Sequence, residues 1–193
     1  MAILQIYYNT GEDGFGDVIR PGNWRTQTFT TVAAYTISSV KLFLYRMVAG
    51  ADGVITVSIR AVDVATGKPT GDDLASGTFN RDILTIDTAG EWKEITFDTA
   101  YFLQATTQYA IVVGPAVGTG DTYWRSDTTG DPYPDGTRNW STDAGSTWGT
   151  PSTNQDYLFE TWGDSYIFTP PSDIITYKRL IAVANNKIWY EDL

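Results

Sequence analysis

The sequence contains no cysteine and no histidine. Without cysteine the protein has no disulfides, thiolate metal ligands or thiol nucleophiles, so its fold depends on packing and hydrogen bonds alone. Without histidine it has no Ser-His-Asp triad, no Cys-His pair and no metal site with imidazole ligands. These two absences exclude most common hydrolase mechanisms, and they leave the compartment of the protein open.

Basic residues are scarce as well, because 13 Lys and Arg stand against 23 Asp and Glu, giving a formal net charge of −10. Binding to a phosphate backbone needs a cluster of Lys and Arg that displaces counterions. The charge balance therefore argues against nucleic acid as a partner.

Long apolar runs are also missing. No segment approaches the ~20 consecutive apolar residues that span a bilayer. Residues 1–8 lack the basic and then apolar pattern of a secretory signal peptide, and polar turn residues follow them. We therefore expect no membrane partner, and a protein that stays in the cytoplasm or leaves it by assembly into something larger.

Short runs of alternating apolar and polar residues are the main pattern that is present. Residues 40–45 and 55–61 place an aliphatic side chain at every second position, which is typical of strands with one buried face. Clusters of Gly, Pro and Asp separate such runs and leave room for few helices. The sequence predicts an all-β fold, an antiparallel two-sheet sandwich over residues 1–163. Its further strands are predicted at residues 92–97, 108–114, 121–126 and 156–162.

The stretch from Thr128 to Asn154 differs in composition. It is rich in Gly, Asp, Ser, Thr and Pro, and it contains Trp140 and Trp148. A loop of this length in a compact domain is usually either functional or disordered, and the embedded tryptophans favour order. We predict a long ordered loop or a loose hairpin here, and a binding surface.

Residues 164–193 are predicted to form a linker and then an arm. Thr169-Pro170-Pro171-Ser172 makes a stiff break, and an apolar segment follows from Ile174 to Tyr190. A two-residue turn at Asn185-Asn186 would fold this segment into a β-hairpin. The predicted cross-strand pairs are Val183 with Ile188, Ile181 with Tyr190, and Arg179 with Asp192.

A helix that begins at Ser172 is the alternative form of the arm. An isolated hairpin or short helix is marginal in water, so either form needs a surface to lie on. We expect a neighbouring subunit or the protein's own sandwich to supply it. The predicted docking residues are Ile181, Val183, Ile188 and Tyr190.

Common catalytic fingerprints are missing from the chain, including the Gly-x-Ser-x-Gly elbow, the Walker-type phosphate loop and the dinucleotide fingerprint. A glycosidase would need only two Asp or Glu residues ~5–9.5 Å apart across a cleft. Few acids fall on predicted strands, among them Glu91, Glu94 and Glu160. Most others lie in turns, where solvation or turn capping explains them. The sequence therefore predicts a protein that is not an enzyme.

Residues 9–17 combine oxygen donors and glycines in the manner of a calcium loop, with the sequence Asn-Thr-Gly-Glu-Asp-Gly-Phe-Gly-Asp. They lack the alternate acids and closing Glu of an EF-hand. A tight turn joining the first two strands explains them equally well. We predict no cofactor, with a structural calcium ion as an open alternative.

The seven tryptophans carry the other functional signal, because exposed indole faces stack on sugars or on partner side chains. Trp92 and Trp162 lie in predicted strands and are expected to pack in the core or on a sheet surface. Trp124, Trp140 and Trp148 lie in or beside the long loop. These three are the predicted ligand-binding residues.

The order of these features resembles the jelly-roll domain of the choice-of-anchor type, which is similar in layout to carbohydrate-binding sandwiches. The resemblance covers roughly residues 25–163. It is carried by strand patterns and turn prolines in the segments 27–30, 39–42, 55–61, 67–71, 92–97, 103–113, 140–148 and 156–159.

The resemblance implies a non-catalytic jelly roll of the kind found in bacterial surface proteins and in structural proteins of tailed bacteriophages. Because no leader or anchor is recognisable, a virion protein assembled in the host cytoplasm is the leading hypothesis. It would be a capsid decoration, tail or spike component that contacts other virion proteins or its own copies as a homo-oligomer. A carbohydrate-binding module with a tryptophan platform is the alternative, and a carboxylate glycosidase is the third hypothesis.

Overall fold

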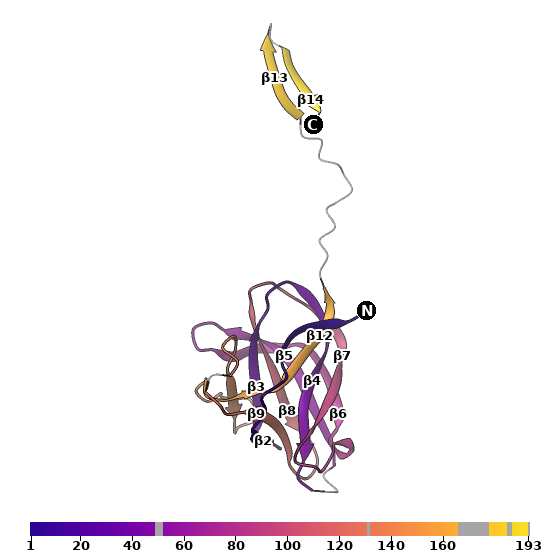
Figure 1. Ribbon diagram of the computed structural model, residues 1–193, viewed down its shortest axis with the longest axis vertical. Helices are drawn as coiled ribbons and strands as arrows, with labels where there is room; N and C mark the ends of the chain where they lie inside the picture. Colours follow the sequence, from indigo (N-terminus) through magenta and orange to yellow (C-terminus); the bar gives the residue numbers. More distant parts are fainter. Residues whose placement is uncertain (49–51, 131, 166–177, 185–186, 193) are drawn as a thin grey trace.

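The computed structural model describes residues 1–48, 52–130, 132–165, 178–184 and 187–192 (Figure 1). Within these residues the fold is all-β, with every strand pair antiparallel and one short 3₁₀ turn at Arg81–Ile83. Two sheets of seven and five strands pack as a sandwich, which confirms the predicted class. No helix in the described ranges is long and apolar enough to cross a membrane.

The seven-stranded sheet is organised around the long strand β4 (Tyr35–Arg46). One side of β4 pairs with β7 (Glu91–Leu103), and the other side pairs with β12 (Phe159–Ser165) and then with β9 (Thr122–Asp127). β1 (Ile3–Tyr8) lies beside β12, and β2 (Gly14–Ile19) lies beside β9. The short strand β11 (Asp156–Tyr157) also pairs with β9.

The five-stranded sheet has the order β10-β3-β8-β5-β6. Its strands are β10 (Arg138–Ser141), β3 (Trp24–Thr30), β8 (Gln108–Ala116), β5 (Val54–Asp63) and β6 (Lys68–Asn80).

The core lies between the two sheets and follows the alternation of the sequence. Val40, Leu42 and Leu44 of β4 are fully buried, as are Ile55, Val57 and Ile59 of β5. Successive side chains of a strand point to opposite faces, so each run presents one apolar face to the other sheet. The inward faces predicted from these two runs are confirmed.

The long loop predicted at 128–154 contains a strand. Residues 138–141 form β10, which pairs with β3 and extends the five-stranded sheet. The stretch also folds back on itself, because Arg138 and Ser152 form an antiparallel bridge and the Gly149 backbone N–H donates to the Trp140 carbonyl at 2.8 Å, so the predicted loose hairpin is present over residues 138–152. Beyond β10, Trp148 packs against Trp24 with ring centroids 6.5 Å apart. This contact holds the rest of the stretch against the outer face of the five-stranded sheet, where Ala110 and Val112 are also buried.

The C-terminal strands β13 (Lys178–Ala184) and β14 (Lys187–Asp192) form a separate two-stranded sheet. The predicted pair Val183 with Ile188 is confirmed. A bulge between Leu180 and Ala182 then changes the register, so the predicted pairs of Ile181 with Tyr190 and Arg179 with Asp192 are wrong. A bulge places two residues of one strand opposite one residue of its partner, which shifts all later pairs by one. The observed pairs are Leu180 with Tyr190, Arg179 with Glu191, and Lys178 with Asp192.

Residues 178–184 are extended, which contradicts a helix in that part of the arm. The turn predicted at 185–186 and the linker at 166–177 lie outside the described residues. So do the side chains of the predicted docking residues Ile181, Val183, Ile188 and Tyr190.

Candidate functional site

The three candidate tryptophans lie in three different surroundings. Trp124 is fully buried in the core, where its ring stacks on Tyr157 with centroids 4.5 Å apart and its Nε1 donates to the Leu158 carbonyl at 2.8 Å. Its neighbour Tyr123 is the residue that faces outward and stacks on Tyr45. Because β9 alternates between its two faces, Trp124 turns inward, and its prediction as a ligand-binding residue is wrong.

Trp148 packs on the outer face of the five-stranded sheet. Its indole forms an edge contact with Trp24 and lies against the small apolar cluster on the outer face of the five-stranded sheet. Gly145 brings the same loop onto the Trp24 ring, since a Cβ at Gly145 would lie 2.5 Å from Trp24 Cζ3. The loop is therefore held by contacts that only a glycine permits at this position.

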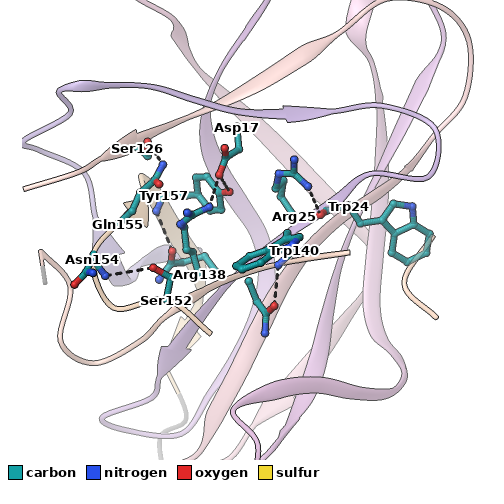
Figure 2. A network of polar contacts seen from close by, with 12 residues as sticks. Asp17, Trp24, Arg25, Ser126, Arg138, Trp140, Ser152, Asn154, Gln155 and Tyr157 are labelled. Atoms are coloured by element: carbon teal, nitrogen blue, oxygen red, sulfur yellow. Dashed lines mark hydrogen bonds and ion pairs between the residues drawn. The ribbon is translucent and has the colours of Figure 1, made fainter. Parts of the chain in front are cut away.

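Trp140 is the predicted residue that lines a cleft. It is half-buried, and the cleft of about 230 Å³ is lined by Trp140 together with Asp17, Arg25 and Arg138. In Figure 2 the Trp140 side chain lies between those of Arg138 and Arg25. We take this cleft as the candidate functional site.

The pairing of β10 with β3 explains why these side chains meet. Trp140 lies opposite Arg25, and Arg138 lies opposite Gln27. Residues two apart share a face, so all four side chains point to the same side of the sheet. This is the inner side of the sandwich, because Arg25 and Gln27 lie opposite Val113 and Ile111, which belong to the main core. Asp17 reaches the cleft from β2 of the other sheet, so both sheets contribute to its walls.

Asp17 holds the two sheets together at this point. Its Oδ2 accepts hydrogen bonds from Arg138 Nη1 and from the Tyr157 hydroxyl, each at 2.5 Å. Burial, and then the negative charge of Asp17, raise the pKa of Tyr157 far above its usual value. Tyr157 is therefore a neutral hydrogen-bond donor at any physiological pH.

Arg25 differs from Arg138 in having no carboxylate partner. The residue is 9% exposed, and its Nη1 donates to the Trp24 carbonyl at 2.9 Å. Its Nε is buried without a hydrogen-bond partner. Within the described part of the chain no acidic oxygen lies within 4.0 Å of it, whereas Arg138 has Asp17. The described residues that line the cleft thus carry two positive charges and one negative charge, in a protein of net charge −10.

A buried polar network forms the wall behind the cleft. Gln27 Nε2 donates to Asp156 Oδ1 at 2.7 Å, and the Tyr157 backbone N–H donates to Gln27 Oε1 at 2.9 Å. Asp156 Oδ2 also accepts from the Tyr133 backbone N–H at 3.2 Å. Satisfied buried networks of this kind are rigid. Both sheets are therefore fixed where the cleft opens.

The segment 9–17, where a calcium loop was an open alternative, joins β1 to β2, as the turn interpretation predicts. The two strands lie beside different partners and do not form a hairpin. Its acids are engaged by neighbours: Glu12 pairs with Arg125 at 2.9 Å, and Asp13 accepts from Thr128 and Thr129. Across the described residues no three acidic side chains gather into a group that could hold a metal ion.

The strand carboxylates considered for catalysis lie outside the cleft. Glu94 accepts from Ser39 Oγ at 3.0 Å, and Glu160 accepts from Trp162 Nε1 at 2.9 Å. Glu91 accepts from the Thr85 backbone N–H. Trp162 itself lies under Lys41 Nζ at 4.3 Å, and the partly exposed Trp92 packs on Phe43, so both have the packing role that was predicted for them.

Comparison of the chain with protein-family models and with curated protein sequences found no match. The jelly-roll resemblance is therefore supported at the level of an antiparallel two-sheet β-sandwich, and no family is identified.

Sequence reasoning missed the polar lining of the cleft. Asp17 was considered only as part of a calcium loop, and Arg25 and Arg138 were not considered. The sequence does contain a signal for this lining. Arg25 and Gln27, and likewise Arg138 and Trp140, are two residues apart, so in a strand each pair shares one face. That these two strands are neighbours is a tertiary fact.

Proposed function

We propose that this protein is a non-enzymatic structural component of a tailed-phage particle, in which the β-sandwich is the body and the C-terminal hairpin joins neighbouring subunits. One observation carries the proposal: β13 and β14 pair with each other and with no strand among the described residues of the sandwich. A two-stranded hairpin is marginally stable by itself in water. It is therefore suited to gain its stability on another surface.

The resemblance to jelly-roll domains of phage structural proteins supports the same assignment. Capsid decoration, tail and spike proteins all act through contacts between subunits. The partner in this proposal is a second copy of the chain or another virion protein, and the expected location is the virion.

Light scattering on the purified full chain and on a chain that ends at Phe168 tests this proposal. We expect the full chain to form an oligomer and the shortened chain to be a monomer. A third variant, with residues 169–193 replaced by a Gly/Ser segment of equal length, controls for size and should also be a monomer. Equal assembly of the full and shortened chains would contradict the role of the hairpin.

Carbohydrate recognition in the cleft is the second candidate function, and the two functions are compatible. The observation that favours it is the half-buried Trp140 ring beside the incompletely hydrogen-bonded guanidinium of Arg25. An aromatic wall with a few converging polar groups is the usual composition of a small-molecule site. In this candidate function the ligand would contact one tryptophan and two arginines, whereas the sequence predicted a platform of three tryptophans.

A glycan array with the intact protein and two variants tests this second function. Trp140→Ala should abolish retention, whereas Trp92→Ala, which removes a partly exposed indole from the outer face of the other sheet, should retain it. The melting temperatures of all three proteins should stay close. Absence of any glycan retention by the intact protein would end this candidate.

The glycosidase hypothesis has the least support. Among the described residues that line the cleft, Asp17 is the single carboxylate, and both Arg138 and Tyr157 already hold it. The mechanism needs two carboxyl groups that face each other across the substrate.

A further inference from the structure

The guanidinium of Arg25 is a nearly buried cation, and no described residue pairs a carboxylate with it. A guanidinium has five N–H donors, and the described residues supply Arg25 with one acceptor, the Trp24 carbonyl. Burying a charge without a partner is costly, and leaving a buried donor unsatisfied adds to that cost. An anion in the cleft would remove both penalties.

The charges around the cleft favour a single negative group. Among the described residues that line the cleft, Arg138 is paired with Asp17, and Asp156 in the wall behind is hydrogen-bonded to Gln27 and to the Tyr133 backbone, so Arg25 is the cation with no acidic oxygen within 4.0 Å. A carboxylate carries one negative charge and matches the planar guanidinium in shape, so it forms charge-assisted hydrogen bonds with it. A phosphate carries about −1.5 to −2 at neutral pH and would be only partly neutralised.

The Trp140 indole lies beside Arg25 in the cleft. Trp140 lies opposite Arg25 in the paired strands, and Gly149 packs on the Trp140 ring, where a Cβ would lie 2.6 Å from Cε2. Gly149 also donates its backbone N–H to the Trp140 carbonyl at 2.8 Å. The indole is therefore held in place, and such rings bind the apolar face of a sugar.

The size of the cleft limits the ligand. A volume of about 230 Å³ is smaller than the ~300 Å³ at which sites for drug-sized ligands begin. It suits one sugar ring better than a longer stretch of chain. The net charge of −10 repels anions at long range, so an acidic ligand has to be selected by contacts inside the cleft.

We infer that this cleft recognises a sugar residue that carries a carboxylate, with Arg25 binding the carboxylate and Trp140 contacting the ring. The inference rests on the carbohydrate function proposed above and names its ligand class. Hexuronic acids and sialic acids have this chemistry.

Titration of the full chain, followed by the indole N–H signals in an NMR spectrum, tests the inference. The ligands are D-glucuronate, D-galacturonate and N-acetylneuraminate, with D-glucose and D-galactose as neutral counterparts, and with acetate and a sulfated galactose as further probes. We expect at least one carboxylated sugar to shift the Trp140 signal and to bind about tenfold or more tightly than the neutral sugars, acetate and the sulfated sugar.

Variants separate the role of Arg25 from general electrostatics. Arg25→Met should reduce binding of the acidic sugar to the level of the neutral sugar. Arg20→Met removes the same charge from an exposed side chain outside the cleft and should leave binding unchanged. If Arg25→Met does not fold, Arg25→Lys replaces the planar donor group by a single ammonium and should still weaken binding several-fold.

The failures are distinguishable. Equal binding of neutral and carboxylated sugars, or wild-type affinity in Arg25→Met or Arg25→Lys, would overturn the inference and leave carbohydrate recognition standing. If acetate bound as tightly as the acidic sugars, the sugar ring would contribute nothing to recognition. If the sulfated sugar bound more tightly than the carboxylated sugars, the cleft would not be selective for a carboxylate. No binding of any sugar would overturn both the inference and the carbohydrate function.

Discussion

Trp124 and Trp140 show how much the surroundings of one residue type vary in this protein. Both lie near the glycine-rich stretch in the sequence, but Trp124 is fully buried and Trp140 lines the cleft. Side chains of β9 alternate between its two faces, and because Tyr123 faces outward, the adjacent Trp124 faces the core. The pairing of β10 with β3 decides the second.

Replacing Trp124 by Ala should lower the free energy of unfolding by about 3–5 kcal/mol, because it leaves a large cavity beside Tyr157 and frees the Leu158 carbonyl. Urea denaturation measures the loss. Trp92→Ala is the control and should cost about 1 kcal/mol, since Trp92 is 36% exposed. Equal losses in the two variants would contradict the assignment of Trp124 to the core.

Asp143 makes the loop that follows β10 sensitive to acid. Hydrogen bonds from the Thr147 hydroxyl and backbone N–H, and from the Ser141 hydroxyl, lower the pKa of Asp143 from 3.8 to about 2. A lowered pKa means that this stabilisation is present above the ordinary pKa of 3.8 and is lost as the pH falls toward 2.

We expect tryptophan fluorescence to report a change in the packing of Trp148 on Trp24 between about pH 4 and pH 2. Asp143→Asn, which cannot ionise, should remove this step and leave the rest of the acid titration in place. The same step in the variant would mean that another group is responsible.

At the scale of elements, the strands were easier to predict than their register. The predicted segments fall within or close to β4, β5, β7, β8 and β9. In β4 and β5 the aliphatic residues of the alternating runs are buried, whereas residues 110–113 of β8 are fully buried on both faces. The C-terminal hairpin was predicted with the correct pair near its turn, but the bulge at 180–182 changed the more distant pairs. A bulge depends on local backbone geometry, which alternation of residue types does not encode.

The loop that covers Trp24 depends on close contacts of glycines. Gly145→Ala should detach this loop, because Gly145 has a φ of +80° and a Cβ there would lie 2.5 Å from the indole ring. Limited proteolysis should cut residues 142–151 faster in this variant.

Gly71→Ala is the matched control for this test. Gly71 has a similar φ of +71°, but a Cβ there would meet nothing within 4 Å. Gly71→Ala should lose only the about 1–2 kcal/mol of stability that a left-handed backbone costs an alanine, and its residues 142–151 should be cleaved no faster than in the unmodified protein. Equal proteolysis of that loop in both variants would attribute the effect to backbone strain and not to the contact with Trp24.

At the scale of the whole molecule, the sandwich should fold without the hairpin. Its core is formed by residues between Ile19 and Phe159, most of them in strands of the two large sheets, and β13 and β14 pair with neither sheet in the described ranges. A chain of residues 1–168 should therefore melt within about 2 °C of the full chain in differential scanning calorimetry, measured at a protein concentration low enough for the full chain to dissociate into monomers. A drop of more than about 5 °C would show that the hairpin contributes to the fold of the body.

The sequence by itself determined the fold class, the position of most strands and the composition of the core. It could do so because a strand with one buried face must alternate along the chain, which is a local property. The absence of histidine and cysteine likewise excluded whole classes of chemistry without any structure.

Only the tertiary structure decided where the candidate site lies. Asp17, Arg25 and Arg138 are far apart in the sequence, and they meet because β10 joins the edge of one sheet beside β3 while β2 faces them from the other sheet. The same pairing separated Trp140 from Trp124 and left Arg25 without a carboxylate partner among the described residues. Which strands become neighbours depends on non-local packing between segments more than a hundred residues apart, and residue types along one strand do not specify it.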